Sequence, residues 1–177
     1  MKIRFKAIAL YVLLLVGCLG VPEGIEPVGD FQLERYLGRW YEIARLDHSF
    51  ERGLTHVTAD YEMRGDGTVR VLNRGFSPAK NRWKEAEGKA DFVDRADRGY
   101  LKVSFFGPFY GSYVVVELDR ENYQYALVSG PNRSYLWILA RTPRLAPEVI
   151  DRLVRKAKAE GFDTDGLIFV EQGAKAG

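Results

Sequence analysis

The chain has 177 residues, 46% of them hydrophobic and 28% charged, which fits one soluble folded domain and excludes a disordered or multi-span membrane chain. Its single cysteine excludes an internal disulfide or a cysteine-cluster metal site, and its two histidines offer little for a histidine-rich metal centre. A formal net charge of +2 is too small to indicate a nucleic acid as the main partner, and we expect no metal and no cofactor.

The N-terminal residues 1–17 have the pattern of a secretory signal peptide. Lys2, Arg4 and Lys6 precede an apolar run over 7–16, which is too short to span a bilayer as a helix. The run ends in Leu15-Val16-Gly17-Cys18, which resembles the bacterial lipobox, in which the cysteine becomes lipidated and N-terminal. The alternative is an ordinary signal peptide with a stray cysteine. Leu19 follows where an aspartate would resemble an inner-membrane retention signal, so we expect anchoring in the outer membrane.

Residues 18–30 contain glycine, proline and acidic residues without periodicity, and we expect them to be a lipidated N-terminal tether. One short helical turn is expected over 31–37. The folded domain is therefore predicted to cover 31–173.

From Gly38 onward, apolar and polar residues alternate in short runs that are separated by turn residues. This pattern predicts an all-β protein whose successive strands form an eight-stranded antiparallel up-and-down barrel, which is large enough to hold one small ligand. The predicted strands are 38–47, 55–64, 68–76, 83–93, 99–106, 111–118, 123–129 and 134–141.

A single helix is expected after the strands, from Pro147 to about Glu160, with an apolar stripe on one face and basic residues on the other. Two predicted strands, around 113–118 and 135–140, are apolar on both faces. We therefore expect the helix to pack outside the barrel against them. A last short strand is expected over 167–170.

Two features of this pattern carry a family resemblance. Gly38-Arg39-Trp40 resembles the Gly-x-Trp motif of the first lipocalin strand, and Arg141 lies where lipocalins place an arginine after the last barrel strand. The longer stretches around them resemble the bacterial outer-membrane lipoprotein lipocalins, relatives of animal apolipoprotein D, over roughly 30–172. The resemblance implies a lipid-anchored barrel in the periplasm. Trp40 and Arg141 would stack at its closed bottom, whereas Arg141 as a ligand-binding charge is the alternative.

Strand alternation then gives the inward positions. If Trp40 points into the barrel, Glu42, Ala44 and Leu46 share its face, with Glu42 near the closed end. The candidate ligand-binding residues on the other strands form a long apolar and aromatic set with few polar groups. They are Val57, Tyr61, Val71, Phe105, Tyr113, Val115, Glu117, Tyr135, Trp137 and Leu139.

The links at the open end combine aromatic and basic residues, among them Phe50, Phe106, Phe109, Arg52 and Lys80. This rim suits contact with a phospholipid surface. A folded-down lid with solvated charges and a homodimer contact through 107–110 are the alternatives. His48 and His56 flank the first link and are expected to be surface residues.

These observations predict a lipid-binding protein without enzymatic activity, which holds a fatty acid or lysophospholipid in its barrel for storage or transport in the cell envelope. Two alternatives stay open. One is a structural or interaction lipoprotein with a filled barrel, and the other is a lipid-modifying enzyme that uses Glu117.

Overall fold

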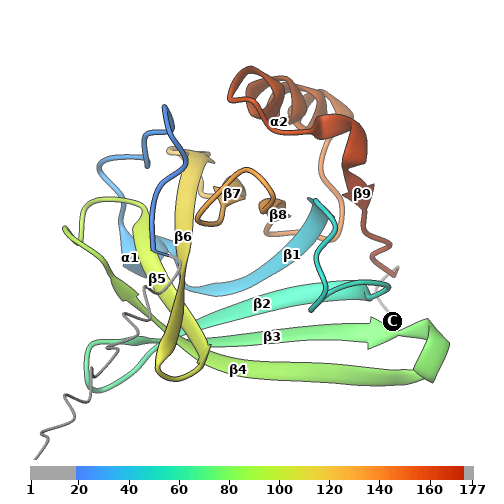
Figure 1. Ribbon diagram of the computed structural model, residues 1–177, viewed down its shortest axis with the longest axis horizontal. Coiled ribbons are helices and arrows are strands. Elements are labelled where there is room, and N and C mark those ends of the chain that lie inside the picture. Colours follow the sequence, from blue (N-terminus) through green and yellow to red (C-terminus); the bar gives the residue numbers. More distant parts are fainter. Residues whose placement is uncertain (1–18, 174–177) are drawn as a thin grey trace, which may run out of the picture.

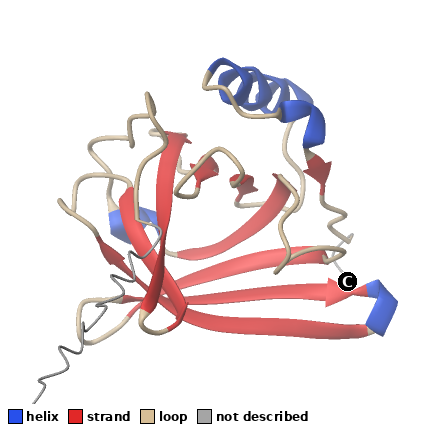
Figure 2. Ribbon diagram, in the orientation of Figure 1, coloured by secondary structure: helices blue, strands red, loops and turns tan. Residues whose placement is uncertain are grey.

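Alternating apolar and polar residues form the strands, and the strands close into a barrel (Figures 1 and 2). The computed structural model describes residues 19–173, so the predicted signal peptide and Cys18 lie outside the described residues. β1 pairs with β8 on one side and with β2 on the other, which closes the sheet. The barrel strands are β1 (Gly38–Arg45), β2 (Thr55–Met63), β3 (Val69–Ser77), β4 (Arg82–Phe92), β5 (Tyr100–Phe106), β6 (Phe109–Leu118), β7 (Tyr125–Ser129) and β8 (Leu136–Ala140).

The eight predicted barrel strands are therefore confirmed, with ends that differ by at most a few residues. Short helical segments lie at the chain's turns: α1 (Leu33–Tyr36), η1 (Pro78–Lys80) and η2 (Thr164–Gly166). Because successive strands are antiparallel neighbours, the links after β1, β3, β5 and β7 lie at one end of the barrel. We call this the open end, since α1 and the Trp40 side chain lie at the other.

The helix α2 (Pro147–Ala159) packs outside the barrel, as predicted. Its buried Leu153 and Ala157 join Val114, Leu127 and Ile138 in an apolar cluster between the helix and strands β6 to β8. This explains why those strands are apolar on both faces. The predicted last strand is β9 (Ile168–Phe169), which pairs with β1 beyond the point where β1 leaves β2.

Residues 19–30, which we call the N-terminal strap, do not form the free tether that the sequence predicts. Ile25 and Val28 are buried, and the Val28 backbone exchanges hydrogen bonds with Val115 and Gly99. A Cβ on Gly99 would lie 2.7 Å from Val28 Cγ2, so only glycine lets the strap lie this close. The prediction is wrong because the scattered apolar residues Ile25 and Val28 pack into the two apolar clusters, which only the folded barrel brings together.

The strand pairing shifts at four places, and two of these shifts, in β1 and β6, move side chains that were predicted to point inward. In β1 the pairing with β8 shifts between Glu42 and Ala44, so that Ala44 and Leu46 join the outer cluster under α2 while Arg45 turns inward. The predicted inward positions of Ala44 and Leu46 are therefore wrong. A second shift in β6 lies between Val115 and Glu117. A bulge adds one residue to one strand and reverses the alternation beyond it.

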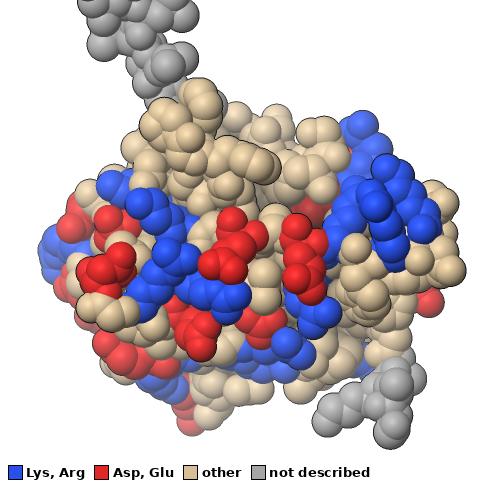
Figure 3. Space-filling model, turned by 90° about the horizontal axis from the view of Figure 1, so that it is seen from below, with Lys and Arg blue, Asp and Glu red and all other residues tan. Residues whose placement is uncertain are grey.

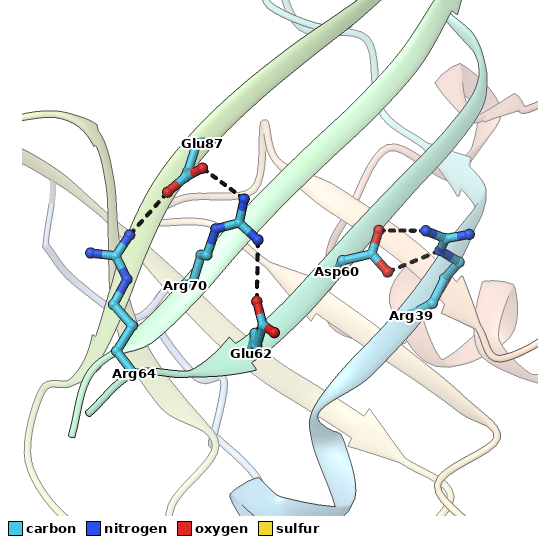
Figure 4. A network of polar contacts seen from close by, with 6 residues as sticks. All are labelled: Arg39, Asp60, Glu62, Arg64, Arg70 and Glu87. Carbon is cyan, nitrogen blue, oxygen red and sulfur yellow. Dashed lines mark hydrogen bonds and ion pairs between the residues drawn. The ribbon is translucent and has the colours of Figure 1, made fainter. Parts of the chain in front are cut away.

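The outer faces of β1 to β4 carry charged side chains of both signs, intermingled across the surface (Figure 3). Arg39 binds Asp60 in a bidentate pair, and Glu87 accepts hydrogen bonds from Arg64 and Arg70 (Figure 4). These outward residues alternate with inward apolar ones such as Tyr61 and Val71. The alternation predicted for β2 and β3 is thus confirmed where no bulge interrupts it.

Candidate functional site

The closed end of the barrel is sealed by a stack of one indole and one guanidinium group. Trp40 is fully buried, its Nε1 donates to the Tyr36 carbonyl at 2.8 Å, and the Arg141 guanidinium lies 4.0 Å from the ring centroid. Arg141 donates to the backbone carbonyls of Tyr123, Arg39 and Arg35 at 3.2, 3.0 and 2.7 Å. All its polar contacts are therefore with the protein's own backbone at the base of the barrel.

Gly38 makes this stack possible. Its backbone has a φ of +89°, which residues with a Cβ rarely adopt, and it lies next to the Arg141 guanidinium. Gly38, Trp40 and Arg141 therefore lie together, at the position where the sequence places the barrel bottom.

Above this stack, three tyrosine hydroxyls form a chain inside the barrel. Tyr61 donates to the Tyr113 hydroxyl at 3.0 Å, and the Tyr113 and Tyr36 hydroxyls lie 2.7 Å apart. Burial raises the pKa of all three phenols, because it disfavours the charged form. The group is therefore neutral and presents polar oxygens at the floor of an otherwise apolar interior.

The wall above the floor contains most of the predicted ligand-binding residues. Seven of them belong to the interior apolar cluster: Tyr61, Val71, Phe105, Tyr113, Val115, Trp137 and Leu139. Val57 is buried beside Gly75 and Leu54, nearer the open end. Tyr135 lies at the rim, with its ring centroid 6.2 Å from that of Trp137.

Several inward side chains are only half-buried, among them Ala59, Val103, Phe105, Tyr113 and Trp137. These side chains pack against the interior cluster and keep part of their surface exposed. Between them the Asn73 Oδ1 is buried without a hydrogen-bond partner among the described residues. The wall is therefore mostly apolar, with polar atoms at few positions.

Glu117 is the exception among the predicted wall residues. Its Oε1 accepts a hydrogen bond from Arg152 of α2 at 3.2 Å, on the outside of the barrel. The prediction that Glu117 points into the interior is wrong, because the β6 bulge reverses the alternation just before it.

A buried group of charged residues lies beneath the link between β1 and β2, and sequence reasoning missed it. Arg45 Nη1 donates to Glu42 Oε1 at 2.6 Å, and Arg45 Nη2 donates to the carbonyls of Glu51 and Leu54 at 2.9 and 3.3 Å. Trp137 Nε1 donates to Glu51 Oε2 at 3.1 Å, and His48 Nε2 lies 3.1 Å from the same oxygen. We call Glu42, Arg45, His48 and Glu51 the charged cluster.

The charged cluster corrects two expectations. His48 is only 6% exposed and is not a surface residue, and Glu42 belongs to this cluster under the open-end link instead of lying at the closed end. Burial and the nearby Glu51 raise the pKa of Glu42 well above its ordinary value, although Arg45 opposes this. Burial also raises the pKa of Glu51. The contacts with His48, Trp137 and Arg45 outweigh burial and keep the pKa of Glu51 below its ordinary value.

The cluster ties the first open-end link to the wall. The Phe50 ring stacks on His48 with centroids 4.0 Å apart, while Trp137 is oriented by its bond to Glu51. The link from β1 to β2 is therefore a packed part of the open end. The sequence contains a partial signal for the charged cluster, because His48 and Glu51 are three residues apart. The signal is incomplete, since their partners Arg45 and Trp137 come from β1 and β8.

Within residues 19–173 no group of three or more His, Cys, Asp or Glu side chains is arranged to hold a metal ion. The same residues contain no helix that is long and apolar enough to cross a membrane.

Comparison with known proteins decides the family. A family model described as a lipocalin-like domain matches residues 31–172. The chain belongs to the lipocalin family. This lipocalin is similar to insecticyanin from the tobacco hornworm Manduca sexta, with a TM-score of 0.70 and 23% identity over 89% of this chain and 88% of that one, which shows the shared fold.

Relatives of higher identity are bacterial lipoproteins. The lipocalin is 64% identical to the outer membrane lipoprotein Blc of Vibrio cholerae, over 90% of this chain and 93% of that protein. It is 51% identical to the outer membrane lipoprotein Blc of Escherichia coli, over 94% of both chains. Mouse apolipoprotein D is 32% identical over 81% of this chain and 78% of that protein. The lipocalin is thus an outer-membrane lipoprotein of the kind that its N-terminal residues predict.

Proposed function

We propose that this lipocalin binds a fatty acid or a lysophospholipid in its barrel and stores or carries it in the cell envelope. The observation that carries the proposal is the half-buried apolar wall above a sealed floor. Apolar burial contributes about 25 cal/mol per Å², so an acyl chain lying along this wall gains ample binding free energy. The polar head would then lie near the open end.

Cys18, as the lipidation site, is part of the same proposal. The bacterial relatives are named outer membrane lipoproteins, and a lipobox-like sequence ends at the only cysteine of the chain. Acylation there would keep the barrel at the membrane from which its ligand comes.

The proposal of binding without catalysis has support from Glu117. The enzymatic alternative needs this carboxylate inside the barrel beside a tyrosine or histidine. Glu117 instead pairs with Arg152 on the outer surface. The other predicted ligand-binding residues of the wall are apolar or are tyrosines, which suit binding.

The three tryptophans allow a sharp test of ligand binding. Trp137 lies on the wall, Trp40 is buried at the floor, and Trp83 is 51% exposed on the outer face of β4. We expect lysophospholipid added to the Cys18→Ser protein to change the tryptophan fluorescence, with saturation at micromolar concentration. Trp137→Phe should remove most of this change, whereas Trp83→Phe should preserve it.

The filled-barrel alternative predicts a different result. If neither lysophospholipid nor fatty acid changes the fluorescence, and native mass spectrometry of detergent-free protein shows no bound lipid, the barrel is a structural unit and the proposal fails.

A further inference from the structure

The hairpin of β3 and β4 extends the inner face of the barrel toward the open end. The two strands pair without a register shift over the whole of β3, from Val69 to Ser77. Val69 and its partner Ala90 belong to the interior apolar cluster. Because the alternation of faces continues unbroken, Ser77 and its partner Arg82 lie on the same inner face. Lys84, two residues along β4 from Arg82, lies there as well.

This part of the inner face is accessible. β4 pairs with β5 only from Lys89 to Phe92, so that among the described residues no strand pairs with the other edge of 82–88 (Figure 1). Ala86, which points inward by the same alternation, is exposed, and Lys84 is half-buried. A ligand that extends from the apolar wall toward the open end can therefore contact these side chains.

The inner face changes from apolar to charged along the hairpin. Val71 belongs to the interior apolar cluster, and Asn73 follows on the same face, nearer the open end. The Oδ1 of Asn73 is buried without a hydrogen-bond partner among the described residues. Lys84 and Arg82 continue the series in steps of about 7 Å along the strand. An acyl lipid has the same order of chemistry, with an apolar chain, a polar linkage and a head group.

The two cations on this face are available to a ligand. Neither Lys84 nor Arg82 forms an ion pair with another residue of the described chain. The ion pairs that β3 and β4 do form lie on the outer face, where Arg70 binds Glu87 at 2.8 Å and Arg74 binds Glu85 at 2.8 Å. The inner face at the open end therefore has a positive potential that the protein itself does not neutralise.

We propose that Lys84 and Arg82 form a subsite for an anionic head group, so that the barrel selects amphiphiles by the negative charge of the head. The group that is recognised is an anionic oxygen group, either a phosphate or a carboxylate, which an ammonium and a guanidinium both bind. This inference rests on the proposed function, because the head group reaches the subsite only if the acyl chain lies along the wall.

The first test compares three lipids of one acyl length that differ in the head group. Lysophosphatidylglycerol has a net negative charge, lysophosphatidylethanolamine has no net charge, and monoacylglycerol has no phosphate. The Trp137 fluorescence of the Cys18→Ser protein measures binding below the micelle concentration of each lipid. We expect lysophosphatidylglycerol to bind about tenfold more tightly than monoacylglycerol, with lysophosphatidylethanolamine between them. High salt should reduce this difference, because it screens exposed charges.

Lys84→Gln and Lys89→Gln are a matched pair of variants. Both remove an ammonium group from β4, but Lys89 is exposed on the outer face. Lys84→Gln should weaken the binding of lysophosphatidylglycerol about tenfold and leave that of monoacylglycerol unchanged. Lys89→Gln should leave the binding of both lipids unchanged. Lys84→Arg, which retains the positive charge, should keep the preference for lysophosphatidylglycerol.

Palmitate tests the other source of an anionic head group. A loss of palmitate binding in Lys84→Gln would show that the subsite recognises negative charge itself, whereas a loss confined to lysophosphatidylglycerol would show that it recognises phosphate.

Two results would overturn the inference and leave the proposed function intact. One is equal affinity for lysophosphatidylglycerol and monoacylglycerol, and the other is an equal loss of lysophosphatidylglycerol binding in Lys84→Gln and Lys89→Gln. Absence of binding by all four lipids would instead reject the proposed function and this inference together.

Discussion

At the scale of single residues, Arg141 shows how one side chain can close a barrel. Its guanidinium covers the Trp40 ring and donates to three carbonyls that belong to α1, β1 and the link before β7. A planar fork with several donors is suited to this, whereas an ammonium group is a point charge. The residue joins the adjacent segments α1 and β1 to the link before β7, which is far from them in the sequence.

Arg141→Lys should therefore lower the free energy of unfolding by about 2 kcal/mol, because it loses the stacking and at least one charged hydrogen bond. Urea unfolding of the Cys18→Ser protein would measure this. Arg144→Lys is the control, since Arg144 is exposed and carries no such stack. An equally small effect at both positions would mean that the stack adds no stability.

Glu42 makes the stability depend on pH in a definite direction. Its pKa is raised above the ordinary 4.5, so the native state binds this proton more tightly than the unfolded chain does. This contribution is fully present below pH 4.5 and is lost as the pH rises through the folded-state pKa. Glutamine is neutral at every pH. As the pH rises through the folded-state pKa of Glu42, Glu42→Gln should therefore become more stable relative to the wild type.

Urea unfolding at pH 4, 6 and 8 would show this gain as a growing difference between the two proteins. Glu62→Gln, with a carboxylate that is 70% exposed, serves as the control for simple charge removal. A difference that shrinks with pH would contradict the raised pKa of Glu42.

At the scale of elements, the C-terminal segment after β9 holds two diverging strands together. β1 and β2 pair only from Gly38 to Tyr41, and beyond that point Gln172 Nε2 donates to the carbonyls of Glu42 and Val57 at 2.7 and 2.8 Å. The His56 amide bonds to the Glu171 carbonyl at 2.7 Å. The seam between β1 and β2 is therefore closed by a segment from the other end of the chain.

Gln172→Ala should cost about 1–2 kcal/mol of stability and loosen this seam, because two backbone carbonyls lose their donor. Hydrogen exchange should increase at residues 55–58 and not at the equivalent backbone of β3. Unchanged exchange at 55–58 would show that the seam is held by other contacts.

The elements also show what sequence reasoning can reach. Alternation predicts strand order and the inward faces of β2 and β3, since those strands keep their register near Tyr61 and Val71. It fails at Ala44 and Glu117, because no residue type in the sequence marks the bulges at those points. The strap and the charged cluster were missed for a related reason: Val28 packs against Val115 of β6, and His48 packs against Trp137 of β8, and both partners are distant in the sequence.

At the scale of the whole molecule, the binding wall exists only in the closed barrel. A ligand that binds there should therefore raise the free energy of unfolding. A ligand that binds only the folded state adds RT ln(1 + [L]/Kd), or about 2.7 kcal/mol at a concentration of one hundred times Kd. Lysophospholipid should therefore raise the melting temperature of the Cys18→Ser protein steadily with concentration. A melting temperature that is independent of lipid in calorimetry would argue for a filled interior.

The sealed floor has one further consequence. Trp40 and Arg141 block the closed end of the barrel. A ligand that enters through the open end must therefore leave through the open end. A barrel with one opening cannot pass a ligand from one end to the other, so the fold itself does not set a direction of transfer. If lipid binds in the barrel as proposed, the supply and removal of lipid around the protein would set the direction of any net transfer.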